Sequence, residues 1–233
     1  DGLSEDILAA TKKYCGAMAV SLYEPYIGYD DIFKKISSMG IKCNAHVILK
    51  KDTIDMLTNW FKNPPHFFQW VNAVIILNYK PITSGSDLMV RDILKLKQFY
   101  DSVSSCNTVK IGFDSCSVPG IVSWMNVNPA LVEPCESARF SAFISEDLKM
   151  YPCSFMASTS MYGDLKSQLL TDIWRNHPVF VTHREKIANN NCFACKARNL
   201  CNGGCVFIPE INQCLCLILF VFFNLNTAQR FKA

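Results

Sequence analysis

Cys-Phe-Ala-Cys-Lys-Ala-Arg-Asn-Leu-Cys-Asn-Gly-Gly-Cys, residues 192–205, is the stretch that decides how this chain folds. It contains four thiols, at Cys192, Cys195, Cys201 and Cys205, and two glycines come directly before the last of them. A tight group of thiols needs backbone that bends closely around a metal ion or an inorganic cluster, and glycine permits such bends. The spacing therefore predicts metal ligation.

The remaining cysteines are unevenly placed. Seven of the twelve lie from Cys153 onward, whereas the first hundred residues contain only Cys15 and Cys43. A chain of 233 residues does not need disulfides to fold, and no signal peptide leads it, so we expect reduced thiols in a cytoplasm rather than disulfides or inert buried thiols. Cys15, Cys43 and Cys106 have no partners nearby in the sequence, and we expect them to be buried or incidental.

Two kinds of metal site are compatible with the thiol count. One zinc ion would be satisfied by the four thiols of residues 192–205. That site leaves five cysteines unexplained: Cys116, Cys135, Cys153, Cys214 and Cys216. Two cubane iron–sulfur clusters need about eight thiolates, and the region from Cys116 to Cys216 offers nine.

Composition excludes some classes of partner. Half of the residues are hydrophobic, which is enough for a sizeable core, and the formal net charge is only +3. Lysine and arginine are not clustered with aromatic residues, so we expect no nucleic-acid partner and no membrane partner.

The first 115 residues alternate between strand and helix patterns. We expect strands at residues 17–22, 41–49, 71–77 and 108–113, and helices at 29–39, 53–61 and 87–103. This alternation predicts an α/β fold in which parallel strands form part of a (β/α) barrel or an open sheet. Functional groups should then gather where the strands end, near Ser21, Lys50, Tyr79 and Asp114. Asp114 is a weak catalytic candidate, since a turn-capping role is at least as common for such an aspartate.

A second, irregular α+β module begins at Cys116. Short apolar runs at residues 140–144 and 148–151 predict a hairpin, and residues 165–174 predict a helix that leads to the cysteine loop. The apolar run 214–223 indicates a buried strand or an atypical tail, because it is too short to span a membrane. We therefore divide the chain into residues 1–115, residues 116–216 and an apolar tail at residues 217–233.

The cysteine spacing resembles that of the SPASM domain of radical S-adenosylmethionine enzymes. The pattern is Cys135, Cys153, Cys192-x2-Cys195-x5-Cys201-x3-Cys205 and a later cysteine, and the segments Tyr-Pro-Cys at 151–153 and Asn-Gly-Gly-Cys at 202–205 are also similar. One departure is Leu148, where the family pattern has glycine. The segment Ser-Leu-Tyr-Glu-Pro at 21–25 resembles the end of the fourth strand of the radical S-adenosylmethionine barrel, so the resemblance implies that Ser21 contacts this cofactor.

By this resemblance the thiols would hold two auxiliary 4Fe–4S clusters. The first would be bound by Cys135, Cys153 and Cys205, with Cys116 as the fourth ligand. The second would be bound by Cys192, Cys195, Cys201 and Cys214, with Cys216 as the alternative to Cys214. The resemblance further implies a peptide or protein substrate, a sulfatase among the open choices, and an electron donor such as flavodoxin or ferredoxin.

The family's radical-generating Cys-x3-Cys-x2-Cys motif is absent from this sequence. We expect that the chain is a C-terminal part of such an enzyme, that the intact enzyme also holds S-adenosylmethionine and a third 4Fe–4S cluster, and that this chain alone is inactive. The alternative function is a zinc-stabilised interaction module on a degenerate α/β domain. For His46, His66, His177 and His183 we expect hydrogen-bonded structural roles.

Overall fold

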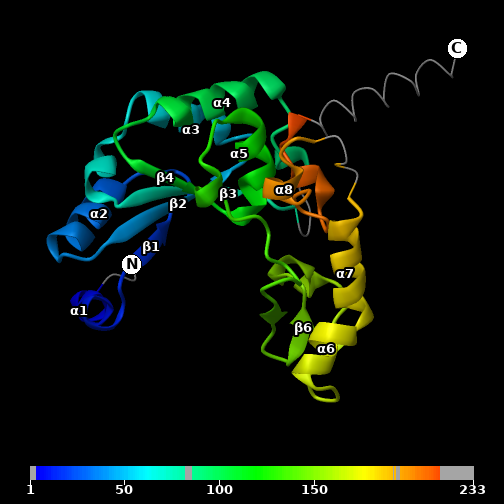
Figure 1. The fold of residues 1–233 in the computed structure, drawn as a ribbon. Coiled ribbons are helices and arrows are strands. Elements are labelled where there is room, and N and C mark those ends of the chain that lie inside the picture. The colour runs from blue at the N-terminus through cyan, green and yellow to red at the C-terminus, as the bar shows by residue number, and fades with distance from the viewer. Residues whose placement is uncertain (1–3, 82–85, 191, 193–194, 216–233) are drawn as a thin grey trace, which may run out of the picture. The chain divides into compact units, whose positions relative to one another are not determined.

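The computed structural model describes residues 4–81, 86–190, 192 and 195–215, and the chain divides into two compact units (Figure 1). The first unit comprises Asp1–Tyr79 and Asp87–Asp114, and the second comprises Lys80–Ser86 and Ser115–Ala233. Each unit has its own sheet within the described residues, four-stranded in the first and three-stranded in the second.

The sheet of the first unit is entirely parallel. Its strands are β1 (Met18–Ser21), β2 (Cys43–Leu49), β3 (Ala73–Asn78) and β4 (Lys110–Phe113), and they pair in the order β1-β2-β3-β4. In a barrel wall, each crossover likewise places the next strand beside the previous one. The predicted α/β class with parallel strands is therefore confirmed, and each strand lies within two residues of its expected position.

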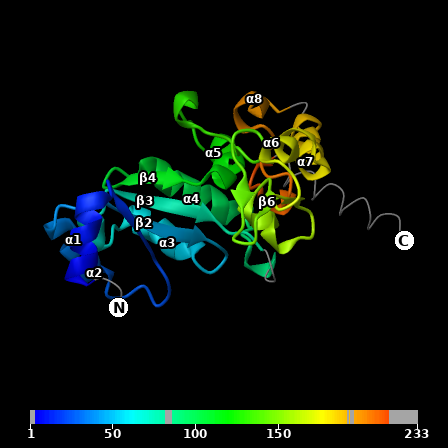
Figure 2. The ribbon, with the colours of Figure 1, turned by 90° about the horizontal axis from the view of Figure 1, so that it is seen from below.

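Helices connect these strands: α2 (Tyr29–Ser38), α3 (Ile54–Lys62) and α4 (Ile93–Ser105). Another helix, α1 (Glu5–Tyr14), precedes β1. Figures 1 and 2 show α3 and α4 side by side, and the rings of Phe61 and Phe99 join them with centroids 6.1 Å apart. Both side chains are buried, so this contact belongs to the core of the unit.

The predicted start of α4 was wrong. We expected a helix from residue 87, but a short 3-10 turn occupies Ser86–Leu88 and α4 begins only at Ile93. The side chain of Asp92 accepts hydrogen bonds from the backbone N–H groups of Leu94 and Lys95, at 2.9 and 3.1 Å. This aspartate is a favourable N-cap, and it sets the helix boundary.

The second unit contains the predicted hairpin. Strands β5 (Phe143–Ile144) and β6 (Lys149–Tyr151) are antiparallel, and β7 (Gly163–Asp164) adds to β6. The turn between β5 and β6 closes with a hydrogen bond from the Leu148 N–H to the Ser145 carbonyl at 3.0 Å. Leu148 has a φ of +66°, a conformation that glycine adopts without steric cost. The glycine of the SPASM pattern at this position thus has a geometric reason.

Four short helices complete the second unit within the described residues: α5 (Val118–Trp124), α6 (Leu170–Asn176), α7 (Pro178–Ala188) and α8 (Arg198–Cys201). We did not predict α5 and α7. The helix expected at residues 165–174 begins later, because Ser167 and Gln168 donate backbone hydrogen bonds back to the Asp164 carbonyl in a turn. The core joins β6, α6 and α7 through the buried residues Ala138, Met150, Tyr151, Met156, Ile173, Val179 and Phe180.

Single 3-10 turns link these elements: η1 (His66–Trp70), η2 (Ser86–Leu88), η3 (Ser115–Ser117), η4 (Pro129–Leu131), η5 (Ser154–Ser158) and η6 (Pro209–Ile211). In the part of the chain that the structure describes, no helix has the length and apolar character to cross a membrane. The apolar run that we expected to be a strand or a tail lies outside the described residues from residue 216 on.

Candidate metal centres

Four of the predicted ligands line one cavity in the second unit. They are Cys116, Cys135, Cys153 and Cys205. Burial raises the pKa of the Cys153 and Cys205 thiols, and the charge of Cys135 raises both further. Such mutual effects require that the sulfur atoms lie close to one another. We call these four residues the first thiol group.

A larger cavity of about 460 Å³ borders the first thiol group. Cys116, Cys135 and Cys153 line it, together with the exposed Glu133 and Glu136. On one side the thiols therefore face an open cavity, and this cavity has room for a group larger than a single ion.

Cys205 is held in place by a buried asparagine. The backbone N–H of Cys205 donates to Oδ1 of Asn212 at 2.8 Å, and Nδ2 of Asn212 donates to the Cys205 carbonyl at 3.1 Å. The N–H of Ile208 points at the sulfur of Cys205 at 3.2 Å. Hydrogen bonds of this kind stabilise a thiolate and tune the potential of a bound cluster. We did not predict a role for Asn212, since a lone asparagine carries no spacing signal.

Gly204 lets the backbone approach this asparagine. Its φ is +71°, and a Cβ atom at this position would overlap Asn212 and the ring of Pro119 from α5. Gly203 also has a positive φ, +83°, which glycine adopts without steric cost. We predicted that these two glycines bend around a metal, and the backbone of the folded chain requires both of them.

The other predicted ligands among the described residues form a second thiol group, Cys192, Cys195, Cys201 and Cys214. Burial is the main cause that raises the pKa of the Cys201 thiol to about 12. The other three members of the group also raise it through their charge. Cys192 and Cys195 are joined by a turn in which the Cys195 N–H donates to the Cys192 carbonyl at 3.1 Å. Cys216, the alternative to Cys214, lies outside the described residues.

The chemistry of both groups suits iron–sulfur clusters, because every donor is a thiol and thiolates are their usual ligands. Among the described residues, no three His, Cys, Asp or Glu side chains stand close enough to share one metal ion. The raised pKa values of Cys153, Cys192, Cys201 and Cys205 keep these thiols protonated without metal. Ligation would therefore release protons.

The first unit presents polar groups at the carboxyl end of its sheet. Ser21 is exposed at the end of β1 and stands in register with His46 of β2. Asp114 follows β4, and its carboxylate accepts the backbone N–H of Asn78 at 3.3 Å. This bond gives Asp114 a structural role at the end of β3.

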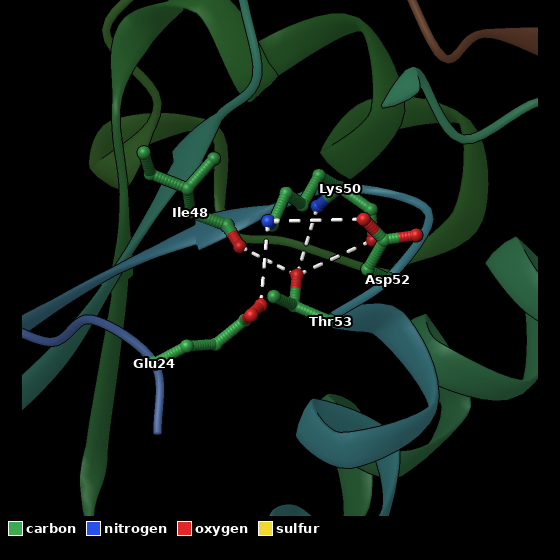
Figure 3. A network of polar contacts seen from close by, with 5 residues as sticks. All are labelled: Glu24, Ile48, Lys50, Asp52 and Thr53. Atoms are coloured by element: carbon green, nitrogen blue, oxygen red, sulfur yellow. Dashed lines mark hydrogen bonds and ion pairs between the residues drawn. The ribbon is translucent and has the colours of Figure 1, made fainter. Parts of the chain in front are cut away.

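Lys50 directly follows β2 and belongs to a polar network that Figure 3 shows. Its ammonium group lies 3.4 Å from Oε1 of Glu24 and 3.8 Å from Oδ2 of Asp52, and the hydroxyl of Thr53 accepts its backbone N–H at 3.0 Å. Lys50 is therefore neutralised by neighbouring carboxylates, and its side chain connects the ends of β1 and β2.

Two histidines have the structural roles that we expected. His183 is buried and its Nε2 lies 2.9 Å from the Ser137 hydroxyl, while Nδ1 of His177 accepts the N–H of Val179 at the start of α7. Burial is the main cause that lowers the pKa of His183 to about 4, so its ring is neutral.

Of the cysteines that we expected to be buried or incidental, Cys43 is buried and Cys15 is exposed.

Comparison with known families identifies the second unit. The sequence profile of the SPASM family, described as an iron–sulfur cluster-binding domain, matches residues 135–196. This range begins at Cys135 and includes Cys153, Cys192 and Cys195. The chain contains a SPASM domain. The predicted resemblance to a SPASM domain is thereby confirmed for residues 135–196.

Solved structures match the fold across both units. SuiB of Streptococcus suis bound to S-adenosylmethionine matches with a TM-score of 0.63 and 15% identity, over 91% of this chain and 58% of that protein. SuiB bound to its precursor peptide SuiA matches with a TM-score of 0.61 and 14% identity, over 90% of this chain and 56% of that protein. The chain thus spans less than two thirds of these structures. No curated protein sequence matches the chain.

Proposed function

We propose that this chain is the auxiliary cluster-binding part of a radical S-adenosylmethionine enzyme that modifies a peptide or protein. The observation that carries the proposal is the gathering of separate thiols, from a hairpin, a loop and a helix, into two groups in the SPASM domain. The peptide substrate is supported by the fold shared with SuiB, which binds a precursor peptide.

Each thiol group is proposed to hold one 4Fe–4S cluster. The first would be bound by Cys116, Cys135, Cys153 and Cys205. The second would be bound by Cys192, Cys195, Cys201 and either Cys214 or Cys216. Bound clusters of this type supply one-electron transfer. The chain itself contributes the Ile208 N–H at the Cys205 sulfur and the Asn212 side chain that orients Cys205.

The rest of the enzyme follows from the same proposal. Residues 1–115 form part of the barrel, residues 116–216 form the cluster domain, and Ser21 faces S-adenosylmethionine in the intact enzyme together with a third 4Fe–4S cluster. Flavodoxin or ferredoxin is the proposed class of electron donor. Reduced thiols require a reducing compartment, so the protein is placed in the cytoplasm.

Anaerobic reconstitution with iron and sulfide tests the proposal. We expect a brown protein with about eight iron atoms per chain, since each cubane holds about four. Cys135→Ala and Cys153→Ala should each lower the iron content by about half, because they remove ligands of the first cluster only. Cys43→Ala is the matched control, since this buried thiol belongs to neither group.

A different metal would contradict the proposal. A colourless protein that binds only zinc, with a zinc content unchanged by Cys135→Ala, would indicate the zinc-stabilised interaction module instead. Absorbance near the cluster bands and metal analysis of the same sample separate the two results.

A further inference from the structure

A groove of about 300 Å³ lies in the SPASM domain beside the first thiol group. One wall is a face of α7, and residues from η5, from the loop before β7 and from the segment after Cys205 complete it. His183 and Phe207 line both this groove and the thiol cavity. A molecule in the groove would therefore lie one side chain away from the first thiol group, without using any of its cysteines.

The groove has the dimensions of an extended peptide. Val179, Thr182 and Lys186 lie on the same face of α7, since residues three and four apart are neighbours on a helix. From Val179 to Lys186 the helix rises about 10 Å. An extended chain rises about 3.3 Å per residue, so about three residues would span this length. The volume lies at the lower limit of ligand pockets, about 300 Å³.

The α7 wall of the groove differs in chemistry between its two ends. Val179 supplies apolar surface at one end and Lys186 a positive charge at the other, and Met156 and Met161 add apolar surface to the lining. No aspartate or glutamate lines the groove, and no described carboxylate forms an ion pair with Lys186. Charge complementarity thus selects an anionic group at one end and an apolar group at the other.

We propose that this groove binds an extended segment of the peptide substrate in which an apolar side chain and a carboxylate lie about two residues apart. The carboxylate pairs with Lys186, and the apolar side chain packs against Met161 and Val179. That the segment belongs to the substrate rests on the proposed function. Binding at this position would hold the substrate close to the first thiol group.

Peptide binding to the full chain tests this inference. The probe is fluorescein-labelled Gly-Leu-Gly-Glu-Gly, and the comparison peptides carry Gln or Lys in place of Glu. At low salt we expect the Glu peptide to bind at least about fivefold more tightly than the Gln peptide, with a preference that weakens at high salt. Lys186→Glu should reverse the preference in favour of the Lys peptide. Fluorescence anisotropy gives each dissociation constant.

The matched control is Lys166→Glu, an exposed lysine that does not line the groove. It should leave the order of the three peptides unchanged. Equal affinities for the three peptides, or the same reversal with Lys166→Glu, would overturn the inference. Iron content, measured on the same preparations, separates the two proposals. Full iron without peptide selectivity overturns only the groove, and selectivity without iron overturns only the cluster proposal.

Discussion

Leu148 occupies a backbone conformation that favours glycine. Its φ is +66°, and the residue is 47% exposed. Glycine at this position would remove the strain that a Cβ atom causes. The left-handed conformation costs a residue with a Cβ atom about 1 kcal/mol. Leu148→Ala and Leu148→Gly both remove the half-buried leucine side chain, and only Leu148→Gly also removes the Cβ atom. We therefore expect the free energy of unfolding of the second unit to be about 1 kcal/mol higher in Leu148→Gly than in Leu148→Ala. Denaturant unfolding of the iron-loaded protein measures the free energy of unfolding of both variants. Equal values for the two would show that the Cβ atom at position 148 causes no strain.

Gly204 is the second residue whose missing side chain matters. A Cβ atom there would overlap Asn212 and Pro119, and the φ of +71° adds strain. Since Asn212 orients Cys205, we expect Gly204→Ala to lower the iron content of the reconstituted protein by about half, through loss of the first cluster. Gly16→Ala is the control, because nothing lies within 4 Å of the added atom. Unchanged iron in Gly204→Ala, measured by metal analysis, would refute this role.

Cys43 makes the stability of the first unit depend on pH. Burial raises the pKa of this thiol from 9.0 to about 11. Because the folded state holds the proton more tightly than the unfolded chain, the contribution is complete below pH 9 and is lost as the pH rises toward 11. The stability lost by Cys43→Ala should therefore shrink over this range, by about 1.4 kcal/mol for each unit of pKa shift. Urea unfolding at a series of pH values measures the difference. A stability loss in Cys43→Ala that stays the same at every pH of the series would contradict this prediction.

Among the secondary-structure elements, the sequence predicted strands better than the short helices of the SPASM domain. Strands β1 and β3 contain the apolar runs 18–20 and 73–77, and such runs are typical of parallel strands. Helix α5 contains Pro119 and Gly120, a pair typical of turns, and α7 begins at Pro178, shortly after the expected end of the helix at residues 165–174. Proline is compatible with the first turn of a helix, where its missing N–H is not needed. A proline in the sequence therefore indicates the end of a helix or the start of one, and the sequence alone does not distinguish the two.

The same limit applies to the candidate sites. Thiol spacing pointed to the cysteines themselves, and the structure brings them together in two groups, although ligation stays a prediction. The hydrogen bonds between Asn212 and Cys205, and the groove beside α7, depend on segments that meet only in the folded unit. Val179 and Lys186 lie on α7, a helix that we did not predict. The sequence analysis therefore could not place the two residues on one helix face.

Across the whole molecule, the candidate ligands belong to one unit and the buried parallel sheet to the other. The first thiol group joins η3, the segment that follows β6 and the Cys205 loop, which are far apart in the chain. A bound cluster adds its binding free energy to the folding of the segments that it connects. The SPASM domain should therefore depend on iron, whereas the first unit has a core that contains no proposed ligand.

Hydrogen exchange with and without the clusters tests this dependence. We expect iron loading to slow exchange in β6, α7 and the Cys205 loop by at least about tenfold, and to leave β2, β3 and α4 nearly unchanged. Iron-treated Cys153→Ala should lose the protection of β6 and the Cys205 loop, because it removes a ligand of the first cluster. Cys106→Ala, at a thiol of the first unit, should behave as the unaltered chain. If iron loading slowed exchange equally in both units, the clusters could not be assigned to the thiol groups of the second unit, because the stabilisation would not be confined to that unit.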